Sequence, residues 1–323
     1  FPESHAISFA ILAYGSAYLK RHYAPEFYAS LLNNQPMGFY SPSTIVKDAK
    51  RHGLQVRPVC VMRSDWLCTI EPDDSLRLGL RMVQGLQADH ALNLLKQRRQ
   101  RSFTSIEDFK LRVPLNKDEL RRLAEIGALN CFAKHRRAAM WQVEKDEHPD
   151  DLPVATSERQ SVEASSQLPR CHAVTLPRSH DSPLLPMDVV ERLAADYNGV
   201  GLTTGPHPMT LARPSLPDIW RACDLPKAQH GIILRIAGNV ICRQRPGTAK
   251  GFVFISLEDE TGVSNAIVSP QLFDQQRLLI THESFLMIEG RVQNVDNVVL
   301  VKAQRIEPLP RQRLVGTQSH DFH

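Results

Sequence analysis

The hydrophobic pattern at the start of the chain predicts a helix that is apolar on every side. Residues 1–20, FPESHAISFAILAYGSAYLK, place Ile, Phe, Leu and Tyr all round a helical wheel rather than along one stripe. A helix of this kind is normally buried by other protein. We therefore expect this segment to be covered on more than one side.

Two shorter amphipathic helices are predicted before residue 53. Pro25 is placed to open the first of them. Its buried face is expected to hold four hydrophobic residues, Phe27, Tyr28, Leu31 and Leu32. The second helix has clear ends, with Ser41 as N-cap, Pro42 in the first turn and Gly53 as the stop. The next stretch, LQVRPVCV, reads as extended.

Two helix–turn–helix units, each with a glycine in an apolar turn, are predicted between residues 76 and 141. The first is MVQGLQADHALNLLKQRR around Gly85, and the second is LNKDELRRLAEIGALNCFAKHRRAAM around Gly127. In the second unit, Asn116 and Glu119 have the spacing of a capping box. The apolar stripe behind them consists of Leu120, Leu123 and Ala124.

Helix-hairpin-helix units have a physical use on duplex DNA. Glycine lets the turn approach closely, so that the amides opening the next helix can bond a phosphate. Basic side chains further along would add long-range attraction: Lys96, Arg98, Arg99 and Arg101 in the first unit, His135, Arg136 and Arg137 in the second. The alternative is two ordinary helical hairpins with glycine caps, and the pattern leaves both interpretations open.

Alternating hydrophobic positions predict five strands between residues 229 and 307. They are GIILRIAGNVICRQ, GFVFISLEDETG, SNAIVS, SFLMIEGRVQ and VVLVKAQRI, with a helix, PQLFDQQRLL, between the third and fourth. This arrangement matches an oligonucleotide-binding (OB) barrel. The expected fold class is multidomain α+β, mainly helical at first and ending in an all-β barrel.

Barrels of this type bind single strands across their second and third strands. The candidate residues for a single DNA strand or a protein partner are Arg243, Arg245, Lys250, Phe252 and Phe254. The two phenylalanines share one face of their strand, and the neighbouring Val and Ile share the other. The phenylalanines are therefore either a base-stacking platform or core residues.

Charge divides the chain into unequal parts. Residues 1–141 carry 21 Lys and Arg against 13 Asp and Glu, whereas residues 142–228 carry 8 against 13. The basic first part is the better candidate for a polyanion surface. Residues 142–186, rich in Asp, Glu, Ser and Pro, are expected to form a linker, and GPHP at 205–208 a rigid turn.

Other chemistry is sparse in the sequence. Six cysteines are scattered without CxxC spacing or nearby histidines, which indicates reduced thiols in a cytoplasmic protein and no metal site. No apolar run approaches the roughly 20 residues of a membrane span, so no membrane partner is expected. The acidic groups at 73–74, 150–151 and 258–260 read as solvated turns.

These parts, in this order, resemble the C-terminal third of a bacterial C-family DNA polymerase of the DNA polymerase III alpha subunit type. The resemblance is carried by SHA at 4–6 with YLKRHYAPEFYASLL, by the Gly85 and Gly127 hairpins with IGALNCFAKHRRAAM, by GPHP and by GTAKGFVFISLEDETG. Pro2 and Glu3, the RPGTAKG wording and SHDFH at 319–323 are most similar to the error-prone, damage-inducible branch. Nearly the whole chain is covered, with a weak stretch in the linker.

The resemblance implies an order of domains. Residues 1–70 would be the end of the fingers, 71–141 a tandem duplex-binding region, 142–186 the linker, 187–228 a helix with the GPHP connector, 229–310 the OB domain and 311–323 a tail. His5 would face the phosphates of the incoming nucleotide, and Ser4 would cap its helix. Without the resemblance, a histidine beside an apolar helix is more often structural.

The resemblance also implies catalysis by palm carboxylates that hold two Mg²⁺ ions. No palm is present in this sequence, so we assign no catalytic or metal-binding residue and expect the fragment alone to be inactive. The expected function is the DNA-handling portion of an error-prone DNA polymerase in translesion synthesis and damage-induced mutagenesis. The alternatives are a stand-alone nucleic-acid-binding accessory protein and an OB-containing RNA-binding module of the anticodon-reading kind.

The implied partners follow from the same resemblance. They are primed duplex DNA, the template single strand, deoxynucleoside triphosphates in the full-length enzyme, a Y-family-like polymerase and a RecA-like accessory protein. Replicative members carry a glutamine-led, apolar clamp-binding peptide after the second hairpin. QVEKDE, QSVEASS and QLPRCH lack its aliphatic and aromatic pair, which argues against direct binding to the sliding clamp.

Overall fold

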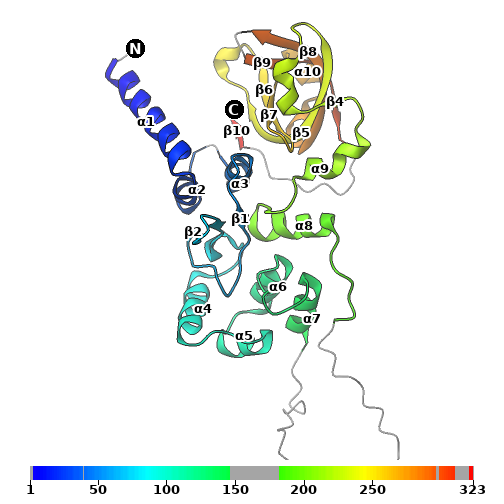
Figure 1. Cartoon of the computed structure of the whole chain (residues 1–323). Helices are drawn as coiled ribbons and strands as arrows, with labels where there is room; N and C mark the ends of the chain where they lie inside the picture. Colours follow the sequence, from blue (N-terminus) through cyan, green and yellow to red (C-terminus); the bar gives the residue numbers. More distant parts are fainter. Residues whose placement is uncertain (1–2, 39, 146–181, 296–297, 310–319, 323) are drawn as a thin grey trace, which may run out of the picture.

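The computed structural model describes residues 3–38, 40–145, 182–295, 298–309 and 320–322. It consists of a helical body with a β-barrel at one end (Figure 1). The predicted linker lies mostly outside the described residues, as do most of the three glutamine-led peptides and the acidic pair at 150–151. The predicted fold class, helices followed by an OB barrel, is confirmed.

Three helices open the described chain, as predicted: α1 (Glu3–His22), α2 (Ala24–Asn33) and α3 (Pro42–Arg51). The Ser41 side chain accepts a hydrogen bond from the Thr44 amide and caps α3. Gly53, which follows α3, has a φ of +85°, where a side chain would be strained. Tyr28 and Leu32 on α2 are each only 1% exposed, so the predicted buried face of α2 is confirmed.

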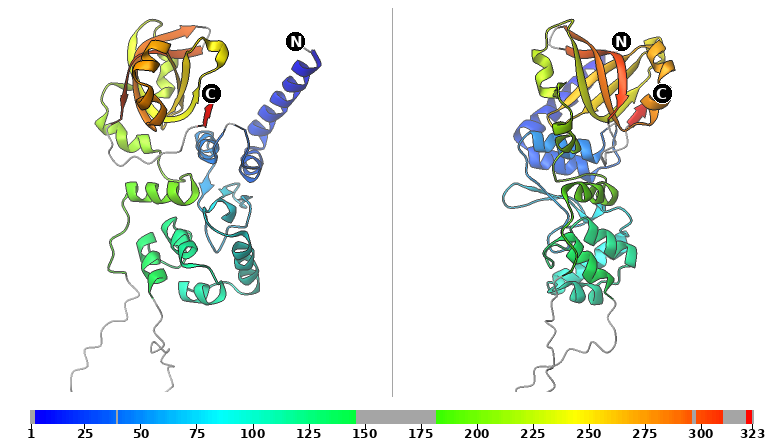
Figure 2. Two further views of the ribbon diagram at one scale, coloured as in Figure 1. Left: turned by 180° about the vertical axis from the view of Figure 1, so that it is seen from behind. Right: turned by 90° about the vertical axis from the view of Figure 1, so that its right-hand side faces the viewer.

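Helix α1 projects from the body, and none of its residues is buried (Figures 1 and 2). Five large hydrophobic side chains on it are more than half exposed: Ile7, Phe9, Ile11, Leu12 and Tyr14. The described part of this chain does not supply the cover that the sequence leads us to expect. The prediction that Ser4 caps α1 is wrong, because the helix begins at Glu3 and includes Ser4.

The middle of the body combines a small sheet with short helices. Its elements are β1 (Val56–Arg57), β2 (Thr69–Ile70), β3 (Leu76–Arg77), the 3-10 helix η1 (Leu80–Met82), α4 (Ala88–Gln100), α5 (Ile106–Arg112), α6 (Lys117–Glu125), α7 (Arg136–Glu144) and α8 (Val189–Val200). One hydrophobic core joins these elements to α2 and α3. Helix α8 packs on α6 so closely that a Cβ on Gly199 would lie 2.2 Å from Ile126 Cγ2.

The connector and the barrel complete the fold. Their elements are α9 (Pro208–Ala212), η2 (Arg213–Ser215), β4 (Ile219–Trp220), η3 (Ala222–Lys227), β5 (Ile233–Gln244), η4 (Gly247–Ala249), β6 (Val253–Glu258), β7 (Val263–Val268), α10 (Pro270–Gln275), α11 (Arg277–His282), β8 (Phe285–Val295), β9 (Val298–Pro308) and β10 (His320–Phe322). Strands run in the order β5-β6-β7-β9-β8, and pairing of β5 with β8 closes the barrel. The predicted helix between the third and fourth strands is split into α10 and α11.

A buried cluster of charges fixes the barrel to the helical body. Glu258, at the end of β6, is fully buried, and its carboxylate lies 2.7 Å from Lys47 Nζ and 2.5 Å from an Arg51 nitrogen on α3. His207 of GPHP lies 4.0 Å away, and burial together with these cations lowers its pKa to about 2. The solvated-turn prediction for Glu258 is therefore wrong, because that carboxylate is buried in ion pairs with two cations of the helical body.

Candidate nucleic-acid interface

The first hairpin places Gly85 directly ahead of α4. Gly85 has a φ of +81°, and no atom lies within 4 Å of where its Cβ would be, so the turn faces open space. The element before it is the single 3-10 turn η1 rather than a full helix. The Gln84 amide donates to the Gly199 carbonyl at 2.8 Å, which ties this turn to α8.

Glu119 of the second hairpin occupies part of the N-terminus of α4 by accepting a hydrogen bond there. Its carboxylate accepts a hydrogen bond from the Gln87 amide at 2.9 Å and lies 2.8 Å from His90 Nδ1. The same carboxylate accepts the Asn116 amide in the predicted capping box, which is confirmed. One amide that a phosphate would use at this helix end therefore already has an anionic partner.

These bonds make stability depend on the ionised form of Glu119. Burial alone would raise its pKa, but the bonds from the Gln87 and Asn116 amides and from His90 outweigh burial and lower it. A lowered pKa contributes stability above the unfolded value, near 4.5, that is lost as pH falls through the folded value.

We expect Glu119→Gln to cost about 1 to 3 kcal/mol of unfolding free energy at pH 7, because it removes bonds to a charged group. The difference from the unaltered protein should shrink below pH 4.5. Denaturant unfolding from pH 3 to pH 7 measures both quantities. A difference that stays constant across that range would mean that the carboxylate charge is not responsible.

The second hairpin is packed rather than open. Gly127 has a φ of +80°, and its Cβ would lie 2.9 Å from Arg136 Nε. The Arg136 guanidinium lies 2.7 Å from Asp196 Oδ1 and donates to the Glu125 and Arg192 carbonyls at 3.2 Å. This side chain holds α6, α7 and α8 together.

The other basic residues named from the sequence differ in how much they are engaged. Arg98 is partly buried and donates to the Val61 and Ser64 carbonyls and to Asp65. Arg137 donates to Glu191 at 2.5 Å and to the Leu185 carbonyl. Within the described residues, the Arg99 side chain makes no hydrogen bond or ion pair.

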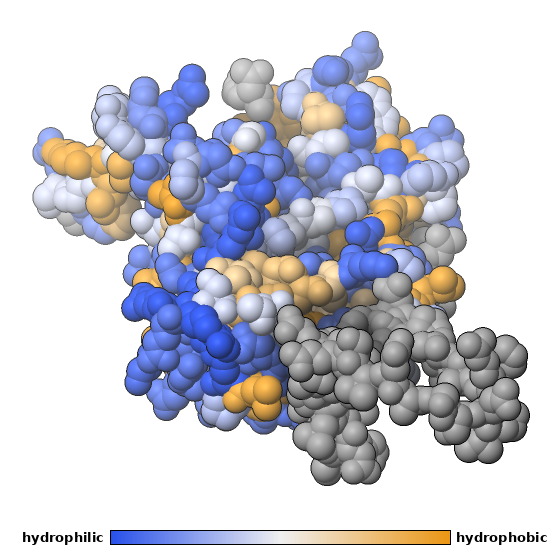
Figure 3. All heavy atoms as spheres, turned by 60° about the horizontal axis from the view of Figure 1, so that its bottom comes forward, coloured by the Kyte–Doolittle hydropathy of each residue, from blue (hydrophilic) through white to orange (hydrophobic). Residues whose placement is uncertain are grey.

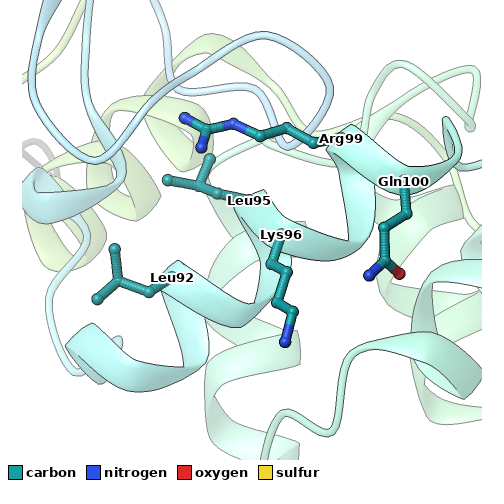
Figure 4. Close-up of a pocket in the computed structure, with 5 residues that line it drawn as sticks. All are labelled: Leu92, Leu95, Lys96, Arg99 and Gln100. Atoms are coloured by element: carbon teal, nitrogen blue, oxygen red, sulfur yellow. The ribbon is translucent and has the colours of Figure 1, made fainter.

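Lys96 and Arg99 stand on one exposed stripe of α4 with Leu92. The spacing of these three residues, four and then three positions, places them on one helix face. Together with Leu95 and Gln100 they line a hollow of about 340 Å³ (Figure 4). Neither cation has a hydrogen-bond or ion-pair partner among the described residues. Figure 3 brings this end of the molecule forward and shows hydrophilic residues over much of its described surface.

On the barrel, the structure decides which face of β6 is inside. Val253 and Ile255 belong to the core, at 3% and 0% exposed, so Phe252 and Phe254 lie on the outer side and are half-buried. Strand pairing sets Phe254 between Gln244 of β5 and Ile267 of β7. The interpretation of these phenylalanines as core residues is therefore wrong.

The three basic candidate residues of the barrel lie in different surroundings. Arg243 is 8% exposed and donates to the Ile280 and Glu283 carbonyls at 2.5 Å, which makes it a support for α11. Arg245 stacks 4.7 Å over the Phe273 ring. Lys250 has a φ of +50° in the loop before β6. Sequence reasoning missed Lys302, which pairs in register with Ile267, because only the strand order brings β9 beside β7.

The remaining predicted site residues, Ser4 and His5, lie in the first turn of α1. His5 stacks edge-on against Phe9, with ring centroids 4.6 Å apart, and the Ser4 carbonyl accepts a bond from Ser8 Oγ. No three His, Cys, Asp or Glu side chains gather to hold a metal ion in the part of the chain that the structure describes. None of the described helices is both long and apolar enough to span a bilayer.

Comparison with known proteins matches both modules to families. A model described as a helix-hairpin-helix motif matches residues 53–139, and one described as an OB-fold nucleic acid binding domain matches residues 231–309. The chain therefore contains a helix-hairpin-helix module followed by an OB-fold nucleic acid binding domain. A solved asparaginyl-tRNA synthetase from Pyrococcus horikoshii covers 27% of the chain at 20% identity, with a TM-score of 0.24, too low to carry an argument.

Relatives that match along the whole chain are error-prone DNA polymerases. The one from Dechloromonas aromatica is 41% identical over 100% of this chain, and the one from Pseudomonas paraeruginosa is 39% identical over 100%. Error-prone DNA polymerase 2 of Rhizobium meliloti is 39% identical over 95%. The chain spans about 30% of the length of these relatives. It is homologous to a segment of error-prone DNA polymerases, and the resemblance to that group is confirmed.

Proposed function

We propose that this chain is the C-terminal, DNA-handling portion of an error-prone DNA polymerase that acts in translesion synthesis and damage-induced mutagenesis. The observation that carries the proposal is homology along the whole chain to enzymes of that name, with both nucleic-acid modules in place. The parent enzyme would transfer nucleotides with Mg²⁺ held outside this chain, and the fragment alone would not extend a primer.

The exposed surface of α1 fits this proposal. The relatives are more than three times as long as the chain, so most of each relative has no counterpart here. Its hydrophobic side chains would pack against that remaining part, with His5 near the nucleotide in the full-length enzyme. His5→Ala in the full-length enzyme tests the second point, since an unchanged Michaelis constant and rate would remove His5 from the site.

The α4 stripe is the surface that we propose for the duplex backbone. Lys96 and Arg99 are exposed cations without described partners in the last two turns of α4, the helix that follows the open turn at Gly85, whereas Arg98 and Arg136 are committed to structural bonds. Cations that neutralise phosphates release counterions, so the affinity falls with salt by a slope of about 0.9 per contact.

We expect the double variant Lys96→Ala, Arg99→Ala to bind primed duplex more weakly and to reduce the salt slope by about 2. Fluorescence anisotropy over a salt series measures both quantities. The matched control is Lys117→Ala, Arg121→Ala, which removes the same charge from a pair already neutralised by Glu144. Equal effects of the two double variants would reject α4 as the contact surface.

A second candidate, single-strand binding by the barrel, is favoured by the outward position of Phe254 on β6, between Gln244 of β5 and Ile267 of β7. A base stacked on an aromatic ring contributes about 1 to 3 kcal/mol. Phe254→Ala should then weaken binding to an unstructured oligonucleotide but not to duplex.

Recruitment by a Y-family-like polymerase and a RecA-like protein is part of the same proposal. Pull-down of either with and without residues 229–309 tests whether the barrel is their dock.

A further inference from the structure

Two cysteines from distant parts of the sequence meet beside the second hairpin. Cys60 lies in the turn before Ser64, and Cys131 lies in the turn after Gly127. The Val61 amide donates to the Ala128 carbonyl at 3.1 Å, and Cys131 Sγ lies 3.9 Å from the same carbonyl oxygen. The Cys60 and Cys131 side chains are neighbours, close enough for each thiol to shift the pKa of the other. No function described above uses them.

The surroundings favour a reactive thiolate at Cys60. The neighbouring Cys131 thiol, the amides of Met62 and Arg63 and the nearby Arg77 cation all favour the thiolate form. Together these outweigh burial and lower the pKa of Cys60 to about 6. Its turn is rigid, because the Cys60 carbonyl accepts the Ser64 amide at 2.8 Å and the Cys60 amide donates to Ser64 Oγ at 3.0 Å.

The two cysteines differ in how exposed they are to solvent. Cys131 is exposed and Cys60 is partly buried, so small oxidants can reach the pair from the Cys131 side. A reactive thiolate with a second thiol in contact is the arrangement that converts an oxidised cysteine to a disulfide before further oxidation. Cys223 is also exposed but has no thiol neighbour among the described residues, so it is a matched internal control.

We propose that Cys60 and Cys131 form a hydroperoxide-reactive dithiol that closes to a disulfide. The Cys60 thiolate attacks the terminal peroxide oxygen, the O–O bond breaks, and an alcohol leaves with a proton while Cys60 becomes a sulfenic acid. The Cys131 sulfur then displaces hydroxide, which leaves as water with the Cys131 proton. Two thiols and one hydroperoxide give one disulfide, one alcohol and one water, and a dithiol reductant reverses the change.

The bond would link the second hairpin to the turn at residues 60–64. It would join the turn after Gly127 to the turn that contains Val61 and precedes Ser64, whose carbonyls hold Arg98 of α4. Oxidation would therefore tie the two turns covalently where they now touch through one backbone hydrogen bond and the thiol contact. This inference stands independently of the proposed polymerase function.

The test treats the 323-residue chain with tert-butyl hydroperoxide, alkylates the remaining thiols and maps the peptides without reductant by mass spectrometry. We expect a linked peptide pair containing Cys60 and Cys131, formed about threefold or more faster than oxidation of Cys223. Oxidation of Cys223 at the same rate, or a disulfide between other cysteines, would overturn the proposal.

Variants separate the two steps. Cys131→Ser should leave Cys60 as a sulfenic acid that dimedone traps, and Cys60→Ser should leave Cys131 no more reactive than Cys223. A trivalent phenylarsine, which needs two adjacent thiols, keeps the test valid if either variant folds poorly. It should bind the unaltered chain with one-to-one stoichiometry and protect only these two cysteines from alkylation, and failure to protect them contradicts the proposal.

Discussion

Replacing Glu258 by Gln is expected to destabilise the chain by about 3 to 5 kcal/mol, because it leaves two cations of α3 without their anion. Lys47 is 8% exposed, and burial lowers its pKa although the Glu258 charge opposes that change. An amide cannot neutralise Lys47 and Arg51 together. The lost stability is that of the junction between the barrel and the helical body. The nearby His207 is uncharged at neutral pH and adds no positive charge there.

The measurement is chemical denaturation followed by circular dichroism, with Trp220 fluorescence as a reporter near the barrel core. The control is Glu289→Gln, which breaks an exposed pair with Arg235 on the same barrel and should have little effect. Equal small losses from both variants would mean that the Glu258 cluster is not what joins the domains. Earlier proteolysis between the helical body and the barrel in Glu258→Gln would localise the effect.

Local signals in the sequence were sufficient for most elements of the fold. Ser41 caps the start of α3, and Gly53 follows its end in a left-handed conformation. Both signals act on residues within four positions along the chain, so the sequence alone reveals them. Asn116 and Glu119 form the predicted capping box for the same reason. The five strands followed from alternation alone, since each strand of a closed barrel buries one face.

The candidate site was less predictable because it depends on residues far apart in the sequence. Glu258 lies 211 positions from Lys47, so nothing nearby distinguishes it from a solvated turn. The second role of Glu119, at the start of α4, likewise needs the packing of α6 on that helix end. The inner face of β6 is decided by the barrel as a whole, because Val253 and Phe252 both suit a strand.

Four of the arginines named from the sequence show the same limit. Composition and spacing treat Arg98, Arg99, Arg136 and Arg137 alike, but only the fold determines which guanidinium meets a carbonyl or carboxylate. A stripe pattern was available as a signal for α4, because Leu92, Lys96 and Arg99 share one face and no acidic residue stands three or four positions from either cation. For Arg136 and Arg137 on α7, the acidic partners lie on α8, beyond the linker, so no local pattern in the sequence identifies them.

Arg136→Met is expected to lower the free energy of unfolding by about 3 kcal/mol while leaving the duplex affinity of the folded protein unchanged. The substitution leaves Asp196 buried without its cation and removes the donor to two carbonyls at the meeting point of three helices. Denaturant unfolding measures the first quantity and anisotropy at fixed salt the second. The sequence-based role of Arg136 as a phosphate contact predicts the opposite pattern, with weaker binding and little loss of stability.

The neighbour Arg137 supplies the control, since its pair with Glu191 is about one-third exposed and its loss should cost at most about 1 kcal/mol. A pH series adds a second readout that only the buried carboxylate explains. Burial already raises the pKa of Asp196, and removing Arg136 takes away a charge that lowers it. A carboxyl with a raised folded pKa stabilises the fold when protonated, and this stability is lost as pH rises through that pKa. The deficit of Arg136→Met should therefore shrink as the pH falls from 7, whereas the small effect of Arg137→Met should stay constant over the same range.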